Sequence, residues 1–169
     1  ELVKLDKLAQ TAVFTSQGIP FIQAGEEVMR DKKGVHNSYQ SPDSINAIDW
    51  NRKTVNADVF AYYKGLIQMR KNHPAFRMGD ADAVRKYLEF IPVEGSNVVA
   101  YRLKGHAGGD AWEDIYVVLN SRKEVAEVTI PEGKYTIVCR DGFISEQGLG
   151  TMYGPVISVP AQSALIFYK

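Results

Sequence analysis

Cysteine is almost absent from this chain of 169 residues, since Cys139 is the only one. A single cysteine excludes an intrachain disulfide, and the paired CxxC or Cys/His spacings that bind zinc are missing as well. The sequence therefore predicts no metal centre and no disulfide framework. A lone cysteine fits a reducing compartment and an exported bacterial protein alike, so it leaves the localisation open.

Net charge and long apolar runs are also lacking. Twenty basic residues balance twenty acidic residues, so no field of one sign would steer the chain to nucleic acid or to a membrane surface. No apolar run approaches the roughly 18 residues that a membrane span needs. The chain has no initiator methionine and no signal peptide, and it starts at Glu1 in a stretch with helical spacing. We therefore expect it to be a piece of a longer polypeptide.

The composition is that of a globular protein, with 45% hydrophobic and 24% charged residues. Apolar residues in 2–15 recur at the spacing of an amphipathic helix, and Gly18 is placed to close that helix. The apolar run 19–24 is too short for a helix and lies between glycines, which predicts a strand buried on both faces. A second helix is predicted from about residue 56 to 72, where His73 and Pro74 end it.

After Phe76 the hydrophobic period changes from 3.6 to 2. Seven or eight short alternating runs follow at intervals of about ten residues, which is typical of an antiparallel β-sandwich. With about 90 residues, 77–169 is long enough to bury a core of its own. We therefore predict a domain boundary near residue 77.

The stretch that follows the predicted strand, up to about residue 52, is the candidate site. A loop of this length is uncommon and is usually either functional or disordered, and the turn chemistry of residues 41–44 favours order. Its polar and aromatic side chains suit a ligand rich in hydroxyl groups: Asn37, Tyr39, Asp43, Asn46, Asp49 and Trp50.

Each of these residues also has a structural interpretation. Glu26, Glu27, Asp43 and Asp49 suggest glycoside hydrolysis, which needs two carboxylates about 5–10 Å apart. Sequence spacing across a loop does not set that distance, and Glu26 is equally expected to hold the loop backbone in place. Trp50 is suited to stacking on a sugar or to packing at the base of the loop.

The other polar residues of the loop also have two interpretations. Asn and Asp side chains commonly cap turns of their own loop. Arg30, Lys32, Lys33 and His36 have the charge to hold a phosphate, but without a glycine-rich cradle they are typical of a solvated face.

The segment GIPFIQAGEEVMRDKKGVHNSYQSPDSINAIDW, residues 18–50, resembles the eighth strand and the following loop of type I pullulanases, which are debranching enzymes of the α-amylase clan. The Ala24–Glu27 motif is shared broadly across that clan. The pattern of Asn37, Ser38 and Tyr39, followed by Ser41-Pro42-Asp43, Asn46 and Asp49-Trp50, is more particular to pullulanases. Residues 66–77 are similar to the end of their last barrel helix, and the strands from about 84 onward match the position of their C-terminal sandwich.

The resemblance implies an α+β fragment. Residues 1–76 would be the C-terminal part of a catalytic (β/α)8 barrel, with a helix, the last strand, a long loop and the last helix. Residues 77–169 would be a C-terminal all-β sandwich domain. Asn37, Tyr39, Asp43, Asn46 and Asp49 would bind substrate, while Glu26 and Trp50 would be structural at the barrel end.

The resemblance also implies what this chain lacks. The catalytic nucleophile, acid/base and transition-state carboxylates of the family lie on earlier barrel strands, so no residue here is expected to be catalytic. The parent would hydrolyse α-1,6 linkages in pullulan, starch or glycogen-type α-glucans with retention, and this chain alone would be inactive. No cofactor is predicted for the chain, although calcium in the parent is compatible with the family.

Two alternatives stay open. One is another α-amylase-clan activity, such as neopullulanase, isoamylase or a transglycosylase. The other is a non-catalytic β-sandwich module that binds α-glucan through exposed aromatic residues such as Tyr101. Because a lone strand at 19–24 would have unpaired backbone groups on both edges, we also expect the isolated chain to self-associate there or to leave the segment mobile.

Overall fold

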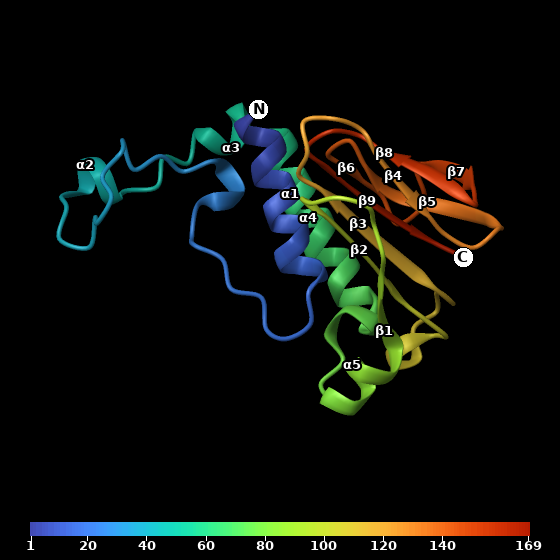
Figure 1. The fold of residues 1–169 in the computed structure, drawn as a ribbon. Helices are drawn as coiled ribbons and strands as arrows, with labels where there is room; N and C mark the ends of the chain where they lie inside the picture. The colour runs from blue at the N-terminus through green and yellow to red at the C-terminus, as the bar shows by residue number, and fades with distance from the viewer.

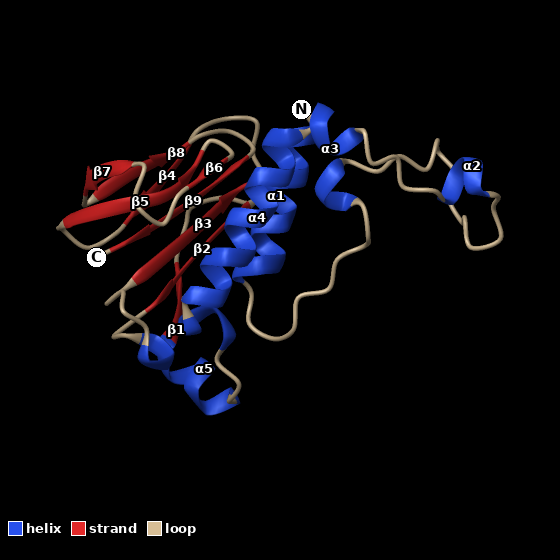
Figure 2. Cartoon of the chain, turned by 180° about the vertical axis from the view of Figure 1, so that it is seen from behind, coloured by secondary structure: helices blue, strands red, loops and turns tan.

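The computed structural model describes residues 1–169 as an α+β fold in three layers. Two long helices lie side by side on one face of a large antiparallel sheet, and a two-stranded sheet packs on the other face (Figure 1). An arm of loops and short helices projects from the helical side, away from both sheets (Figure 2). None of the helices combines the length and apolar character that crossing a membrane requires.

The two long helices agree with the predicted spans. They are α1, Leu2–Thr15, and α4, Ala57–Asn72, which ends before His73 and Pro74 as predicted. The shorter helical elements were not predicted, because one or two turns carry too few residues to show a period. They are α2 Asp43–Asn46, α3 Arg52–Val55, α5 Ala81–Tyr87 and the 3₁₀ turns η1 Glu26–Val28, η2 Pro74–Arg77 and η3 Ala107–Gly109.

The β part is antiparallel throughout, which confirms that prediction. The large sheet has the order β1-β2-β3-β9-β5-β6, with β7 also paired to β5, and β4 pairs with β8 in the small sheet. The number of strands is nine rather than seven or eight, because the two-residue strand β6 lies inside the predicted loop at 141–150 and β7 begins at its last residue. The strands are β1 Leu88–Ile91, β2 Val98–Leu103, β3 Ile115–Asn120, β4 Ala126–Thr129, β5 Lys134–Arg140, β6 Phe143–Ile144, β7 Gly150–Tyr153, β8 Val156–Val159 and β9 Ser163–Tyr168.

The central strand β3 is buried on both faces. Ile115 and Val117 face the larger core, between the sheet and the helices, whereas Tyr116 and Val118 face the smaller core, between the two sheets. This double burial explains why residues 115–119 are continuously apolar. The helices therefore cover the face of the large sheet that a free-standing sandwich would expose to water.

The two cores relate differently to position 77. The larger one joins Leu66 and Met69 of α4 to Val138 and Ile166 of the sheet, so it draws on both sides of that position. The smaller one uses only residues from 100 to 167. The last helix, α4, therefore packs directly against the β part, and the division into 1–76 and 77–169 stays a prediction about the parent protein.

The end of α1 differs from the prediction. The helix ends at Thr15 with Ser16 in an extended conformation, so Gly18, at φ +93°, lies beyond the helix and does not close it. Arg70 of α4 takes that role, because its guanidinium donates hydrogen bonds to the carbonyl oxygens of Phe14, Ser16 and Gly18. The Phe14 carbonyl is one that a helix end leaves without an intrahelical partner, and the other two belong to residues that follow the helix.

The predicted strand at 19–24 is wrong for this chain, since these residues form no strand and pair with no other. Ile19 and Phe21 are 97% and 91% exposed, and Ile22 alone of the apolar residues is half-buried. A strand needs a neighbour to satisfy its backbone N–H and C=O groups. Both sheets of the chain are built from residues 88–168, on the far side of α1 and α4. No strand therefore lies next to segment 19–24 to pair with it.

Candidate functional site

The base of the arm is a tight turn around Gly25. Its φ of +97° suits glycine, and a Cβ at this position would lie 2.8 Å from Cδ of Arg30. The Arg30 side chain packs into that space and donates to the carbonyl oxygen of Ala24 at 3.1 Å. The shared Ala24–Glu27 motif therefore forms a turn against which the side chain of Arg30 packs.

The two glutamates of this turn are engaged in contacts within the chain. Gln10 of α1 donates to Oε2 of Glu26 at 3.0 Å, and the Gly25 amide donates to Oε2 of Glu27 at 3.0 Å. Glu27 thus makes the hydrogen bond to the loop backbone that was expected of Glu26. Close by, burial raises the pKa of Asp6 against the lowering effect of a hydrogen bond from Tyr63, and the Glu26 charge adds to the increase.

The far end of the arm is tied to the same turn. Asn56, at the start of α4, donates to the carbonyl oxygen of Val28 at 3.0 Å, and Nε of Arg52 donates to the same oxygen at 3.4 Å. Val28 itself is fully buried. The arm therefore leaves the body and returns to it at one point, and residues 30–51 between these ties project outward (Figure 1).

Asn46 organises the projecting part. Its Nδ2 donates to the carbonyl oxygens of Ser38 and Ser41, both at 2.7 Å, and its Oδ1 accepts from Nζ of Lys32 at 2.6 Å. The guanidinium of Arg30 also donates to the Asn46 carbonyl oxygen. Loss of solvation and the charge of Arg30 lower the pKa of Lys32. Both polar atoms of the Asn46 side chain are thus used inside the loop.

Two of the sequence-predicted residues, Asp43 and Asp49, line one hollow of about 370 Å³. Arginine and lysine side chains line it as well, and Asp49 accepts a hydrogen bond from the Asn51 amide at 3.0 Å. Both carboxylates are exposed. The basic residues in the same hollow are Arg30, Lys33 and Arg52.

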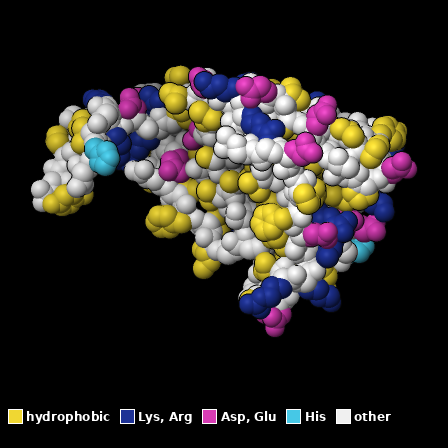
Figure 3. All heavy atoms as spheres, viewed as in Figure 1, with side chains coloured by type: hydrophobic (Ala, Val, Ile, Leu, Met, Phe, Trp, Pro, Cys, Tyr) yellow, Lys and Arg dark blue, Asp and Glu magenta, His cyan; other side chains and the backbone are white.

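The remaining predicted residues lie outside this hollow. Tyr39 is 77% exposed and Trp50 is 64% exposed, and Asn37 is exposed too. Neither aromatic ring packs against the body in this structure. The space-filling view shows the arm standing clear of the body, with charged groups along its length (Figure 3).

Tyr101, the aromatic residue named for the alternative of an α-glucan-binding module, is not exposed on the sheet. Tyr101 is only 7% exposed, and its hydroxyl donates to the carbonyl oxygen of Thr15 at 3.0 Å. Burial raises the pKa of Tyr101 to about 12. Tyr101 is therefore a packing residue that joins β2 to the end of α1.

The arm presents carboxylates, amides, cations and aromatic rings toward solvent. These groups are suited to hydrogen bonding and stacking with a polyhydroxyl ligand. Sequence reasoning missed the positioning roles of Arg30 and Arg52, since the only signal was their basic character. No group of three or more His, Cys, Asp or Glu side chains is arranged to hold a metal ion.

Comparison with known proteins gives a consistent family. The family model described as "Pullulanase, all-beta domain" matches residues 84–142. The pullulanase of Bacillus subtilis strain 168 is 38% identical over 134 residues, which cover 79% of this chain and 18% of the relative. An isoamylase from Flavobacterium sp. is 29% identical over 135 residues, covering 69% of this chain and 17% of the relative.

Solved structures extend the similarity to nearly the whole chain. A pullulanase from Bacillus acidopullulyticus superposes with a TM-score of 0.94 and 43% identity over 99% of this chain and 20% of its own. The type I pullulanase of Bacillus subtilis, solved with maltose, gives a TM-score of 0.90 and 33% identity, over 98% of this chain and 23% of its own. The chain thus spans about a fifth of the length of these relatives.

Proposed function

We propose a function from one premise: this chain belongs to the type I pullulanase-like proteins, of which it makes up about a fifth. The parent protein is a retaining glycoside hydrolase that cleaves α-1,6 linkages in pullulan or related branched α-glucans. The similarity over nearly the whole chain to a pullulanase, at 43% identity, is the observation that carries this proposal.

The chain contributes structure and substrate contacts rather than catalytic groups. Residues 1–76 form the last part of a (β/α)8 barrel, in which segment 19–24 is a strand paired with strands outside this chain, and residues 77–169 are the all-β domain. Supporting this, α1 and α4 flank in sequence an exposed apolar segment that pairs with no strand of this chain. The catalytic carboxylates lie outside the chain, and the chain alone is inactive.

Hydrolysis by the full-length parent tests the activity. We expect it to release short maltooligosaccharides from pullulan and to leave amylose, which lacks α-1,6 linkages, almost uncut. The isoamylase similarity supports a second candidate, a debranching enzyme that prefers glycogen or amylopectin to pullulan. Rates on these two substrates relative to pullulan separate the candidates, and cleavage of amylose alone contradicts both.

Residues 30–51 form one wall of the substrate groove in this proposal. Asp43 and Asp49 accept hydrogen bonds from sugar hydroxyls, Tyr39 stacks on a sugar ring, and Asn37 makes further polar contacts. Asn46 positions the loop, because its amide is already committed to loop contacts. Glu26 and Trp50 hold the base of the loop where it meets the rest of the barrel.

Replacing Asp43 in the parent by alanine should raise KM for pullulan by roughly ten- to a hundredfold, since one hydrogen bond to a charged group contributes roughly 1.5–3 kcal/mol. Tyr39→Ala should act in the same direction. Asp82→Ala is the matched control, because Asp82 is an exposed carboxylate on α5, away from the arm. Steady-state kinetics on pullulan measures all three, and unchanged kcat and KM in both loop variants would mean that the loop is structural only.

Segment 19–24 gives the isolated chain a route to self-association. Ile19 and Phe21 are almost fully exposed, and their backbone groups are free to pair with a second copy. We expect the 169-residue chain to form dimers or larger species at micromolar concentration, and Phe21→Ser to shift it toward monomer. Sedimentation velocity measures this; a wild-type chain that stays monomeric to high concentration would refute the prediction.

A further inference from the structure

A second hollow lies on the body of the molecule, between the helices and the large sheet. It has a volume of about 240 Å³ and is formed where the first turns of α1 and α4 meet two turns of the large sheet. None of its residues belongs to the arm hollow. Its main lining residues are Lys4, Lys7, Asp58, Asp141, Phe143 and Gln162.

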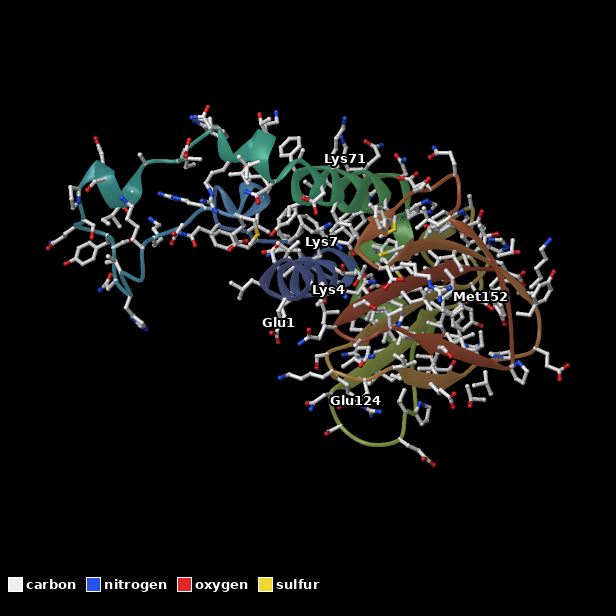
Figure 4. The ribbon with its side chains drawn as sticks, turned by 90° about the horizontal axis from the view of Figure 1, so that it is seen from above. Glu1, Lys4, Lys7, Lys71, Glu124 and Met152 are labelled. Atoms are coloured by element: carbon white, nitrogen blue, oxygen red, sulfur yellow. The ribbon has the colours of Figure 1, made fainter.

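Lys7 forms one wall of this hollow. Its Nζ donates to Oδ2 of Asp58 at 2.9 Å and to the carbonyl oxygen of Gly142 at 3.2 Å, and the side chain is only 12% exposed. The view from above shows Lys7 between α1 and α4, and Lys4 nearer to the start of α1 (Figure 4). An ammonium held by two partners is a fixed donor with little rotamer freedom left to lose.

The β5–β6 hairpin forms the opposite wall. Asp141 and Gly142 make its two-residue turn, with φ of +51° and +75°, as a tight hairpin requires. The hairpin is seated against α4 at Gly65, where a Cβ would lie 2.3 Å from Cγ2 of Ile144. This seat holds Phe143, which is 69% exposed, at the edge of the hollow.

The chemistry of the hollow suits a neutral polyhydroxyl ligand. Lys4 and Lys7 are balanced by Asp58 and Asp141, so a charged ligand gains nothing from the net field. The lysines and the Gln162 amide are donors, while the carboxylates and the Gly142 carbonyl are acceptors. The exposed ring of Phe143 offers an apolar face for the C–H side of a sugar.

We propose that this hollow is an accessory binding site for short α-glucan segments, separate from the groove loop. Its volume is just below the roughly 300–1,000 Å³ of sites for drug-sized ligands, which suits one or two glucosyl units. The choice of an α-glucan rests on the proposed function of the parent. The site would hold a second stretch of a branched substrate while the catalytic groove acts on the first.

Titration of the ¹⁵N-labelled 169-residue chain with maltotriose tests this proposal. We expect saturable shifts at residues 140–144 and 162–164, with a Kd near the millimolar range. Phe143→Ala should weaken binding about tenfold, as expected for loss of one stacked ring. Lys4→Ala, a second variant on the other wall, should weaken it about threefold. Phe90→Ala is the matched control, because Phe90 is 68% exposed on β1 and does not line this hollow.

Three outcomes overturn the proposal: no saturable binding, shifts confined to residues 37–49 of the arm, or equal binding by wild type and Phe143→Ala. Failure of the proposed function has a different readout, which is the absence of pullulan hydrolysis by the full-length parent. An inactive parent combined with Phe143-dependent binding would keep the accessory site and reject the activity. An active parent without that binding would do the reverse.

Discussion

Replacing Arg70 by alanine is expected to lower the free energy of unfolding of this chain by about 3 kcal/mol or more. The guanidinium is buried, with Arg70 only 5% exposed, and it donates to the carbonyl oxygens of Phe14 at 2.8 Å and Ser16 at 2.7 Å as well as to that of Gly18. Truncation leaves these acceptors without a partner and removes the tie between the end of α1 and α4. Urea unfolding followed by circular dichroism measures the loss.

The shape of the side chain should matter as well as its charge. Arg70→Lys keeps the charge, but one ammonium on a flexible stem does not reproduce a planar fork that reaches three carbonyls, so we expect a smaller but measurable loss. Lys71→Ala is the matched control, since Lys71 is the exposed neighbour on the same turn and should change stability by less than about 0.5 kcal/mol. Equal effects of Arg70→Ala and Lys71→Ala would contradict the proposed role of the three hydrogen bonds from Arg70.

The contacts of Arg70 show the difference between what a sequence pattern can predict, which is a helix, and what it cannot, which is a long-range hydrogen bond. The helical period of 2–15 and 57–72 was sufficient to predict α1 and α4, because each buries one face against a core. Arg70 lies in the last turn of α4, where a basic residue suits the helix dipole and gives no sign of any further role. Its actual partners lie more than 50 residues away in sequence, and no local pattern encodes such a contact.

The two errors in the predicted strands have one physical origin. Segment 19–24 has the composition of a buried strand, yet a strand exists only where another strand supplies hydrogen bonds, and this chain supplies none there. Conversely, the short strand β6 was missed because it is two residues long. It forms only because β5 pairs with it and Gly65 lets it approach α4. Both outcomes depend on neighbours rather than on local sequence.

For the candidate loop, the sequence indicated order but not geometry, and its role in binding stays a prediction. Its length was typical of a functional or disordered loop and the turn chemistry of residues 41–44 favoured order, and Asp43 and Asp49 line one hollow. The sequence did not reveal that the Asn46 amide is occupied by Ser38, Ser41 and Lys32. Such a hub arises from the path of the loop in space, which its hydrogen bonds themselves determine.

Asp110→Asn should be about as destabilising as the loss of Arg70, at about 3 kcal/mol near pH 6. The Asp110 carboxylate is fully buried and accepts from Nδ1 of His73 at 2.8 Å, the Trp112 amide at 3.0 Å and the Ala75 amide at 3.2 Å. The His73 ring in turn stacks on Trp112 with the ring centroids 3.5 Å apart. An asparagine would place an NH₂ group against one of these donors. Asp114→Asn is the control, because Asp114 is a half-buried carboxylate whose hydrogen bond to the Gly105 amide lies in an exposed turn.

The pH dependence of this difference identifies the carboxylate charge as its source. Burial alone would raise the pKa of Asp110, but hydrogen bonds from His73 and the Trp112 and Ala75 amides outweigh it and hold the pKa below its ordinary value of 3.8. A carboxyl group with a lowered folded-state pKa contributes stability above pH 3.8 and loses it as pH falls through the folded-state pKa. The gap in unfolding free energy between wild type and Asp110→Asn should therefore narrow as pH falls below 3.8. The other carboxylate near His73 is that of Glu146, at 3.9 Å from Nε2, and it is present in both proteins. Urea titrations at pH 6 and pH 3 measure the gap, and a constant gap would show that packing around the amide, not the charge of Asp110, accounts for the loss.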